Sequence, residues 1–180
     1  MTRRTLIPHP HGVSLPATIT ARVALESAMR LTLEYSLTGD LAQLAIPARV
    51  PTGRADRLWE HTCFEAFIAS AAGARYCELN FSPSTQWAAY SFDGYRQGMR
   101  PLDVAVPTVG VAETNNELRV TAGIELDRLA DARWPWRIGL TAVVEDLAGG
   151  RAYYALEHPR DKPDFHDAAA FTVLLDGSVR

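Results

Sequence analysis

The feature that most constrains this chain is a two-residue alternation of apolar and polar side chains, repeated in short runs between turn-forming residues. In residues 30–37, every second side chain is apolar, and the side chains between them are polar from Thr32 to Ser36. A β-strand gives this pattern when one of its faces is buried. We expect further strands at residues 17–25, 58–69, 75–81, 87–92, 104–111, 117–126, 136–146, 151–158 and 171–175.

About ten short strands with almost no helix predict an all-β fold, an antiparallel β-sandwich of immunoglobulin-like or jelly-roll-like type. The best helix candidate, at residues 127–132, is only a turn or two long. Residues 1–16 contain three prolines and predict an extended lead-in. No repeat or shift in composition marks a boundary, so residues 1–180 are expected to form a single domain.

The charge balance argues against some classes of partner. The net charge of -3 gives no general attraction to nucleic acid or to an anionic membrane surface. No apolar run is long enough for a membrane span or a signal peptide. We therefore expect a cytoplasmic protein of bacterial type with reduced thiols, and the sequence predicts no particular oligomeric state.

The hairpin predicted around Gly73 carries the most polar surface. If residue 70 pairs with residue 75, Glu65 faces Asn80 and Phe67 faces Glu78 across the ladder. One surface then holds an imidazole, a thiol, two carboxylates and an amide, from His61, Cys63, Glu65, Glu78 and Asn80. Such a surface could hydrogen-bond a polar ligand, and the alternative is an ordinary solvated face. Cys77 lies on the opposite face from Cys63, so no disulfide between them is expected.

Two later segments add candidates. In residues 80–99, Trp87 and Tyr95 could stack on a sugar ring. The alternative places Trp87 in the core together with Tyr90 and Phe92, which leaves Tyr95 and Arg96 as the stronger pair. The loop at residues 158–167 gathers ionisable side chains between prolines and suits either binding or a turn network. Its candidates are His158, Lys162, Asp164 and His166.

Sequence motifs for catalysis are missing. There is no nucleophile elbow, phosphate-binding glycine loop or zinc-ligand spacing. Glu65 and Glu78 could act as a glycosidase pair only if a cleft separated them suitably. We therefore assign no catalytic residue and no metal site, and catalysis is the less favoured reading.

The segments LWEHTCFEAF at 58–67, ELNFSPS at 78–84 and YRQGM at 95–99, with the late KPDFH at 162–166, resemble bacterial DOMON-like domains. That family is related to family 9 carbohydrate-binding modules and to haem-binding cytochrome domains. The resemblance spans nearly the whole chain and is most specific over residues 59–99. It implies a β-sandwich that binds sugar or haem, with Trp59 and Trp87 as the nearest counterparts of sugar-stacking tryptophans. A haem would take Met99 with His61, His158 or His166 as its axial ligands.

The sequence therefore favours a non-catalytic module that binds a carbohydrate or a similar polar small molecule without a cofactor. The alternatives are a b-type haem domain, with Met99 and His61 as ligands, and a structural or interaction domain without a small ligand. The expected binding residues are Trp59, His61, Glu65, Glu78, Asn80, Trp87, Tyr95, Arg96, His158, Lys162, Asp164 and His166.

Overall fold

The computed structural model describes residues 3–27, 30–125 and 134–178, and within these ranges the chain is all-β. The predicted helix at 127–132 lies outside them. The strands are β1 (Arg4–Pro8), β2 (Ala17–Ser27), β3 (Arg30–Gly39), β4 (Cys63–Ser70), β5 (Tyr76–Phe81), β6 (Trp87–Phe92), β7 (Arg100–Pro101), β8 (Thr108–Glu113), β9 (Glu117–Glu125), β10 (Trp136–Glu145), β11 (Arg151–Ala155) and β12 (Val173–Leu175). Three short 3-10 helices accompany them: η1 (Leu41–Gln43), η2 (Leu58–Glu60) and η3 (Ala168–Ala170). None of the helices in the described ranges is long and apolar enough to cross a membrane.

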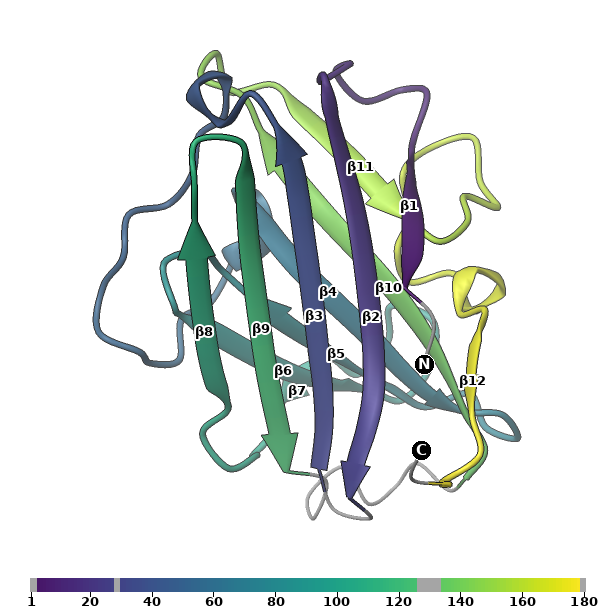
Figure 1. Ribbon diagram of the computed structural model, residues 1–180. Coiled ribbons are helices and arrows are strands. Elements are labelled where there is room, and N and C mark those ends of the chain that lie inside the picture. Colours follow the sequence, from purple (N-terminus) through teal and green to yellow (C-terminus); the bar gives the residue numbers. More distant parts are fainter. Residues whose placement is uncertain (1–2, 28–29, 126–133, 179–180) are drawn as a thin grey trace.

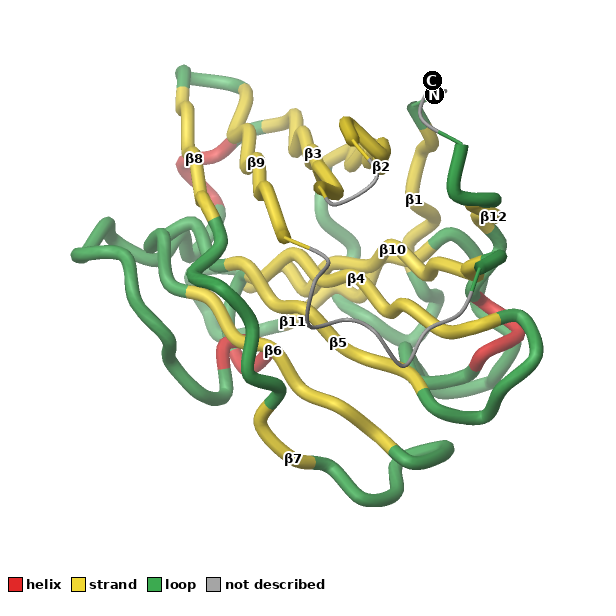
Figure 2. The backbone as a smooth tube through the Cα atoms, turned by 90° about the horizontal axis from the view of Figure 1, so that it is seen from below, coloured by secondary structure: helices red, strands yellow, loops and turns green. Residues whose placement is uncertain are grey.

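The strands form one curled antiparallel sheet in the order β7-β6-β5-β4-β10-β11-β1-β2-β3-β9-β8, with β12 also on β10. The sheet turns at β1, where Leu6 pairs with Ile19 of β2 and Ile7 pairs with Ala155 of β11. This turn divides it into two arms that lie one over the other (Figures 1 and 2). We call β2, β3, β9 and β8 the β3 arm. The β4 arm consists of β11, β10, β4, β5, β6 and β7, with β12.

The main core fills the space between the inner faces of the two arms. On β3 the apolar side chains of the alternating pattern, from Leu31 to Leu37, are buried. They meet Phe64, Ala66 and Ile68 of β4 in one hydrophobic cluster. Tyr35 joins the arms directly, because its ring lies 5.2 Å from that of Phe64 and its hydroxyl donates to the Glu65 carbonyl at 2.5 Å.

The outer face of the β4 arm is buried as well. β4 has only buried residues before its last position, whereas β2 alternates between buried and more exposed positions. A second cluster covers this face and is built from Phe67, Ala69, Tyr76, Ala88, Tyr90, Phe92, Val143, Ala155, Phe165 and Phe171. Its last two members belong to the loop after β11, which therefore packs over the sheet instead of extending into solvent.

The predicted hairpin register is confirmed: Glu65 pairs with Asn80 and Phe67 with Glu78. Cys63 and Cys77 are free thiols. The described ranges hold twelve strands where about ten were expected. The lead-in contributes β1, while residues 58–60 form η2 instead of the start of a strand. β8 begins only after Pro107, which has no amide hydrogen to donate to a ladder.

Candidate ligand-binding site

A cavity of about 350 Å³ lies on the outer face of the β4 arm. Its floor combines Glu65 of β4, Glu78 of β5, Val143 of β10, and Arg151 and Tyr153 of β11. Its walls come from η2, from the end of β6 with the loop that follows, and from the loop after β11. They are formed by Trp59, Phe92, Arg96, Met99, Pro163, Phe165 and His166. Segments far apart in the sequence thus enclose one polar and aromatic hollow.

Glu65 is the most deeply buried charged group of this cavity, with 2% of the residue exposed. Burial raises the pKa of its carboxyl well above the usual range, and the negative charge of Glu78 raises it further. Thr141 faces Glu65 across the β4–β10 ladder. The Thr141 hydroxyl is close enough to act on the Glu65 pKa in the opposite direction, but among the described residues neither Glu65 Oε1 nor Thr141 Oγ1 forms a hydrogen bond of ordinary geometry. A buried acceptor without a partner costs free energy, so this oxygen is ready to accept from a ligand.

Glu78 occupies a diagonal position beside Glu65, also buried. The Asn80 amide donates to Glu78 Oε1 at 2.7 Å, and His166 Nε2 lies 3.9 Å from Oε2. Burial raises the pKa of Glu78, while the Asn80 hydrogen bond and the positive charge of Arg96 act in the opposite direction. Two buried carboxyls this near each other disfavour the state in which both are ionised.

His166 closes the cavity above Glu78. Its ring lies edge-on to Phe67 at 5.2 Å and Phe92 at 5.1 Å, and Nδ1 lies 2.8 Å from the Tyr76 hydroxyl. Burial and the charge of Arg96 lower the pKa of His166 to about 4, so the ring is neutral at neutral pH. A hydroxyl that donates to Nδ1 leaves the ring proton on Nε2, the nitrogen nearer Glu78.

The two loops predicted to flank the hairpin meet at the rim. Asp164 accepts from the Tyr95 hydroxyl at 2.5 Å and from Arg96 Nη2 at 2.8 Å. Although burial acts in the other direction, these two donors hold the pKa of Asp164 below its usual value. Arg96 adopts a left-handed backbone with φ of 53°. The Asp164 carboxylate also accepts from the backbone amide of His166 at 3.1 Å, which bends this loop locally.

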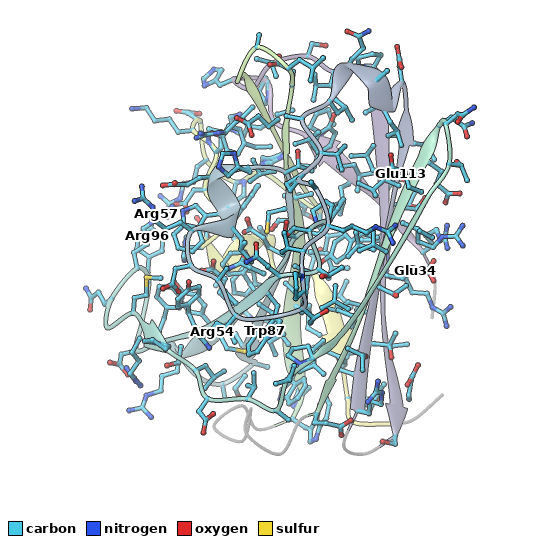
Figure 3. All side chains as sticks on the ribbon, turned by 90° about the vertical axis from the view of Figure 1, so that its left-hand side faces the viewer. Glu34, Arg54, Arg57, Trp87, Arg96 and Glu113 are labelled. Carbon is cyan, nitrogen blue, oxygen red and sulfur yellow. The ribbon has the colours of Figure 1, made fainter. Side chains whose placement is uncertain are left out.

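Several predicted residues lie elsewhere. Trp87 pairs with Phe81 and belongs to the main core, 5% exposed, beneath the Arg54 guanidinium. Its strand position explains this, because Tyr90 and Phe92 have the opposite parity and face outward. Figure 3 shows Trp87 in the body of the molecule, with Arg96 nearer one side and Glu34 on the other. The predicted sugar-stacking role of Trp87 is therefore not met by this geometry.

The remaining predicted residues do not line the cavity. Asn80 is fully buried and supports Glu78 from behind. His61 lies in a second hollow beside η2, where Nδ1 is 2.7 Å from Glu145 Oε2. His158 Nε2 is 2.7 Å from the Ile7 carbonyl, and its ring packs on His9. Lys162 is exposed on the loop after β11.

Among the cavity residues that sequence reasoning missed are Arg151, Tyr153 and Phe165. The Gly149-Gly150 turn carried the signal for the first two. It sets the β10–β11 register that places Tyr153 opposite Val143 and Arg151 opposite Glu145. Phe165 gave no comparable signal, because nothing local indicates that its loop folds back over the sheet.

Met99 and His61, the first pair of haem ligands suggested by the family resemblance, do not lie in one site. Met99 lines the cavity, whereas His61 lies in the second hollow and faces Glu145. His166 does line the cavity, but its two ring nitrogens face Tyr76 and Glu78. Across the described part of the chain, no group of three or more His, Cys, Asp or Glu side chains is placed to hold a metal ion.

No protein-family model and no curated protein matches the sequence. Among solved structures, a candidate carbohydrate-binding protein from Bacteroides uniformis superimposes with a TM-score of 0.70 at 12% identity, covering 94% of this chain and 83% of that one. A family 9 carbohydrate-binding module from Caldicellulosiruptor kristjanssonii, in complex with cellotriose, gives a TM-score of 0.51 at 10% identity, covering 83% and 70%. At these identities the likeness is one of fold, and it is shared with proteins described as carbohydrate-binding.

Proposed function

We propose that this chain is a β-sandwich binding module of the DOMON-like type, which takes a carbohydrate or a similar polar small molecule into the cavity on the β4 arm. The observation that carries the proposal is the lining of that cavity. The buried carboxyl groups of Glu65 and Glu78 share this lining with the rings of Trp59, Phe92 and Tyr153. A sugar matches such a lining, because its hydroxyls hydrogen-bond to carboxylates and its C–H faces pack on aromatic rings.

The groups of the site are held in place before any ligand arrives. Asn80 fixes Glu78 at 2.7 Å, and Trp59 packs edge-on against Tyr90 with a centroid distance of 5.7 Å. Tyr90 is itself anchored, because its hydroxyl donates to Asp56 at 2.6 Å. Preorganised side chains lose little conformational entropy on binding, so they favour affinity.

The fold of the neighbours supports this reading, and one of them holds cellotriose. Cellotriose and glucose are therefore the first neutral probes, to be measured by calorimetry. We expect Glu78→Gln and Trp59→Ala each to weaken binding about tenfold or more, through a lost charged hydrogen bond and a lost aromatic contact respectively.

Matched controls lie away from the cavity. Glu113→Gln, on an exposed position of β8, and Trp134→Ala, on a half-exposed ring stacked on Trp136, should leave affinity unchanged. Circular dichroism verifies that each variant is folded. Affinity that survives both cavity variants, or a broad panel of neutral and charged sugars without a single binder, would overturn the proposal.

A further inference from the structure

The cavity contains two neighbouring buried carboxyl groups that disfavour being ionised together. Glu65 and Glu78 are 2% and 4% exposed, and within the described ranges neither forms an ion pair with an arginine or lysine. Arg96 is committed to Asp164 at 2.8 Å. Among the described residues, Glu65 Oε1 forms no hydrogen bond of ordinary geometry, and the Thr141 hydroxyl is a donor close to its carboxyl.

Apart from Arg96, whose charge acts on Glu78 although its guanidinium is paired with Asp164, the groups that face this pair do not supply a positive charge. His166, over Glu78, is neutral because burial lowers its pKa to about 4. Thr141 on β10, Cys63 on β4 and Tyr35 on β3 are uncharged neighbours of Glu65.

Arg151 lines the same cavity from farther along the sheet. Arg151 pairs with Glu145 across the β10–β11 ladder. Four positions farther along β11, Ala155 pairs with Thr141, which in turn faces Glu65. That offset is about 13 Å of strand. The Arg151 guanidinium therefore serves the far end of the cavity, and the cation that acts on the carboxyl pair is Arg96, which is already paired with Asp164.

Aromatic rings line the cavity that holds the carboxyl pair. Trp59, Phe92, Tyr153 and Phe165 all line the cavity. The face of an aromatic ring attracts a cation, and the attraction grows when water is excluded. Buried carboxylates within an aromatic wall match an ammonium group better than they match a neutral hydroxyl.

We propose that the natural ligand carries a protonated amine, as an amino sugar does, and that its N–H groups donate to Glu65 and Glu78. This inference rests on the proposed function and names the ligand class of the same site. When the carboxyl pair holds one proton, the ammonium takes the place of that proton. One N–H···O contact to Glu65 Oε1 forms, and the displaced proton leaves to the buffer. Charge balances, because one positive charge enters and one leaves.

Calorimetry with three ligands of one ring type tests this. Glucosamine carries the ammonium, N-acetylglucosamine carries a neutral amide at the same position, and glucose carries a hydroxyl. Between pH 5 and 7 we expect glucosamine to bind at least about tenfold more tightly than the other two. In two buffers of different ionisation enthalpy, its binding heat should show release of a proton, and its affinity should rise with pH.

Glu65→Gln separates the inference from the proposed function. The variant keeps the shape of the side chain but removes the charge, so we expect it to lose the glucosamine preference and the proton release. Glu113→Gln, the matched control on β8, should retain both. Equal affinity for glucose and glucosamine, or a preference that persists in Glu65→Gln, overturns the amine inference and leaves sugar binding intact. If none of the three ligands binds, the proposed function fails together with the amine inference.

Discussion

The two arms both carry charged residues on their outer faces, but they keep them in different surroundings. On the β3 arm, Glu34 pairs with Arg3 and Glu117 pairs with Arg119, at the surface. On the β4 arm, Glu65 and Glu78 lie beneath loops and aromatic rings. Solvated ion pairs contribute little to stability, whereas each buried polar atom must be satisfied or else costs free energy. The comparison indicates that the buried polar groups, and the cavity that they line, belong to the β4 arm, whereas the β3 arm carries solvated ion pairs.

The largest expected effect tests whether the outer cluster of the β4 arm is a true second core. Phe67 is 1% exposed and packs on His166 and Phe171. Phe67→Ala should lower the free energy of unfolding by about 3–5 kcal/mol through lost burial and a new void. Thr32→Ala, on the outer face of β3, should change it by no more than about 0.5 kcal/mol. Urea denaturation measures both, and similar losses in the two variants would contradict the distinction.

The next largest effect is a loss of folding stability in acid, caused by His166. The pKa of His166 is about 4 in the folded protein against a usual 6.5. Because folding lowers the pKa of His166, its contribution to stability is complete above the pKa of the unfolded chain, 6.5, and is lost as pH falls through 4. His166 should therefore make the wild type lose about 3 kcal/mol more between pH 7 and pH 4 than His166→Gln does. Parallel stability curves for the two proteins would refute this.

Carboxylates on the two arms should respond to pH with opposite signs. Burial raises the pKa of Glu65, so its contribution is present below the usual value of 4.5 and is lost as pH rises through the raised pKa. Hydrogen bonds from Ser36 and Arg119 lower the pKa of Glu117, so its contribution is present above 4.5 and is lost as pH falls. Unfolding measured from pH 3 to 9 in Glu65→Gln and Glu117→Gln should remove these slopes separately. If Glu65 and Glu117 contribute pH slopes of the same sign to the free energy of unfolding, the predicted difference between the two arms is wrong.

The smallest effect is expected at the surface of the β3 arm. Arg3 pairs with Glu34, and the two side chains are 47% and 24% exposed. Arg3→Ala should cost less than about 1 kcal/mol, because solvent screens the pair and its side chains lose entropy when they associate. The difference from wild type should shrink in high salt, which thermal unfolding at two ionic strengths would reveal. A loss that is large and insensitive to salt would place this pair with the buried groups.

Most of the strands and the hairpin register could be predicted from the sequence because both follow from local pattern, whereas β1 and β7 were not expected as strands. Alternation sets which side chains share a face, and the turn at Gly73 sets Glu65 opposite Asn80. The same parity rule, carried one strand further, would have turned Trp87 inward and Tyr90 outward.

The burial of the polar face could not be predicted in this way. Alternation distinguishes two faces but does not tell whether the second is open or covered. Here the cover comes from Phe165 and Phe171, in a loop remote from β4 in the sequence. That long-range contact converts a polar strand face into a cavity and gives His166 its aromatic surroundings.

β1 joins the two arms, and this has a consequence for the order of folding. Leu6 finds Ile19 after a short loop, but Ile7 must find Ala155 after nearly the whole chain has been made. Pairing between such distant segments is slow, because the entropy of closing the loop must be overcome before the contact stabilises anything. Until that seam closes, β1 and β11 present open edges on which another chain could add a strand. The speed of this last step, more than the stability of either arm, should set how much protein is lost to aggregation during refolding.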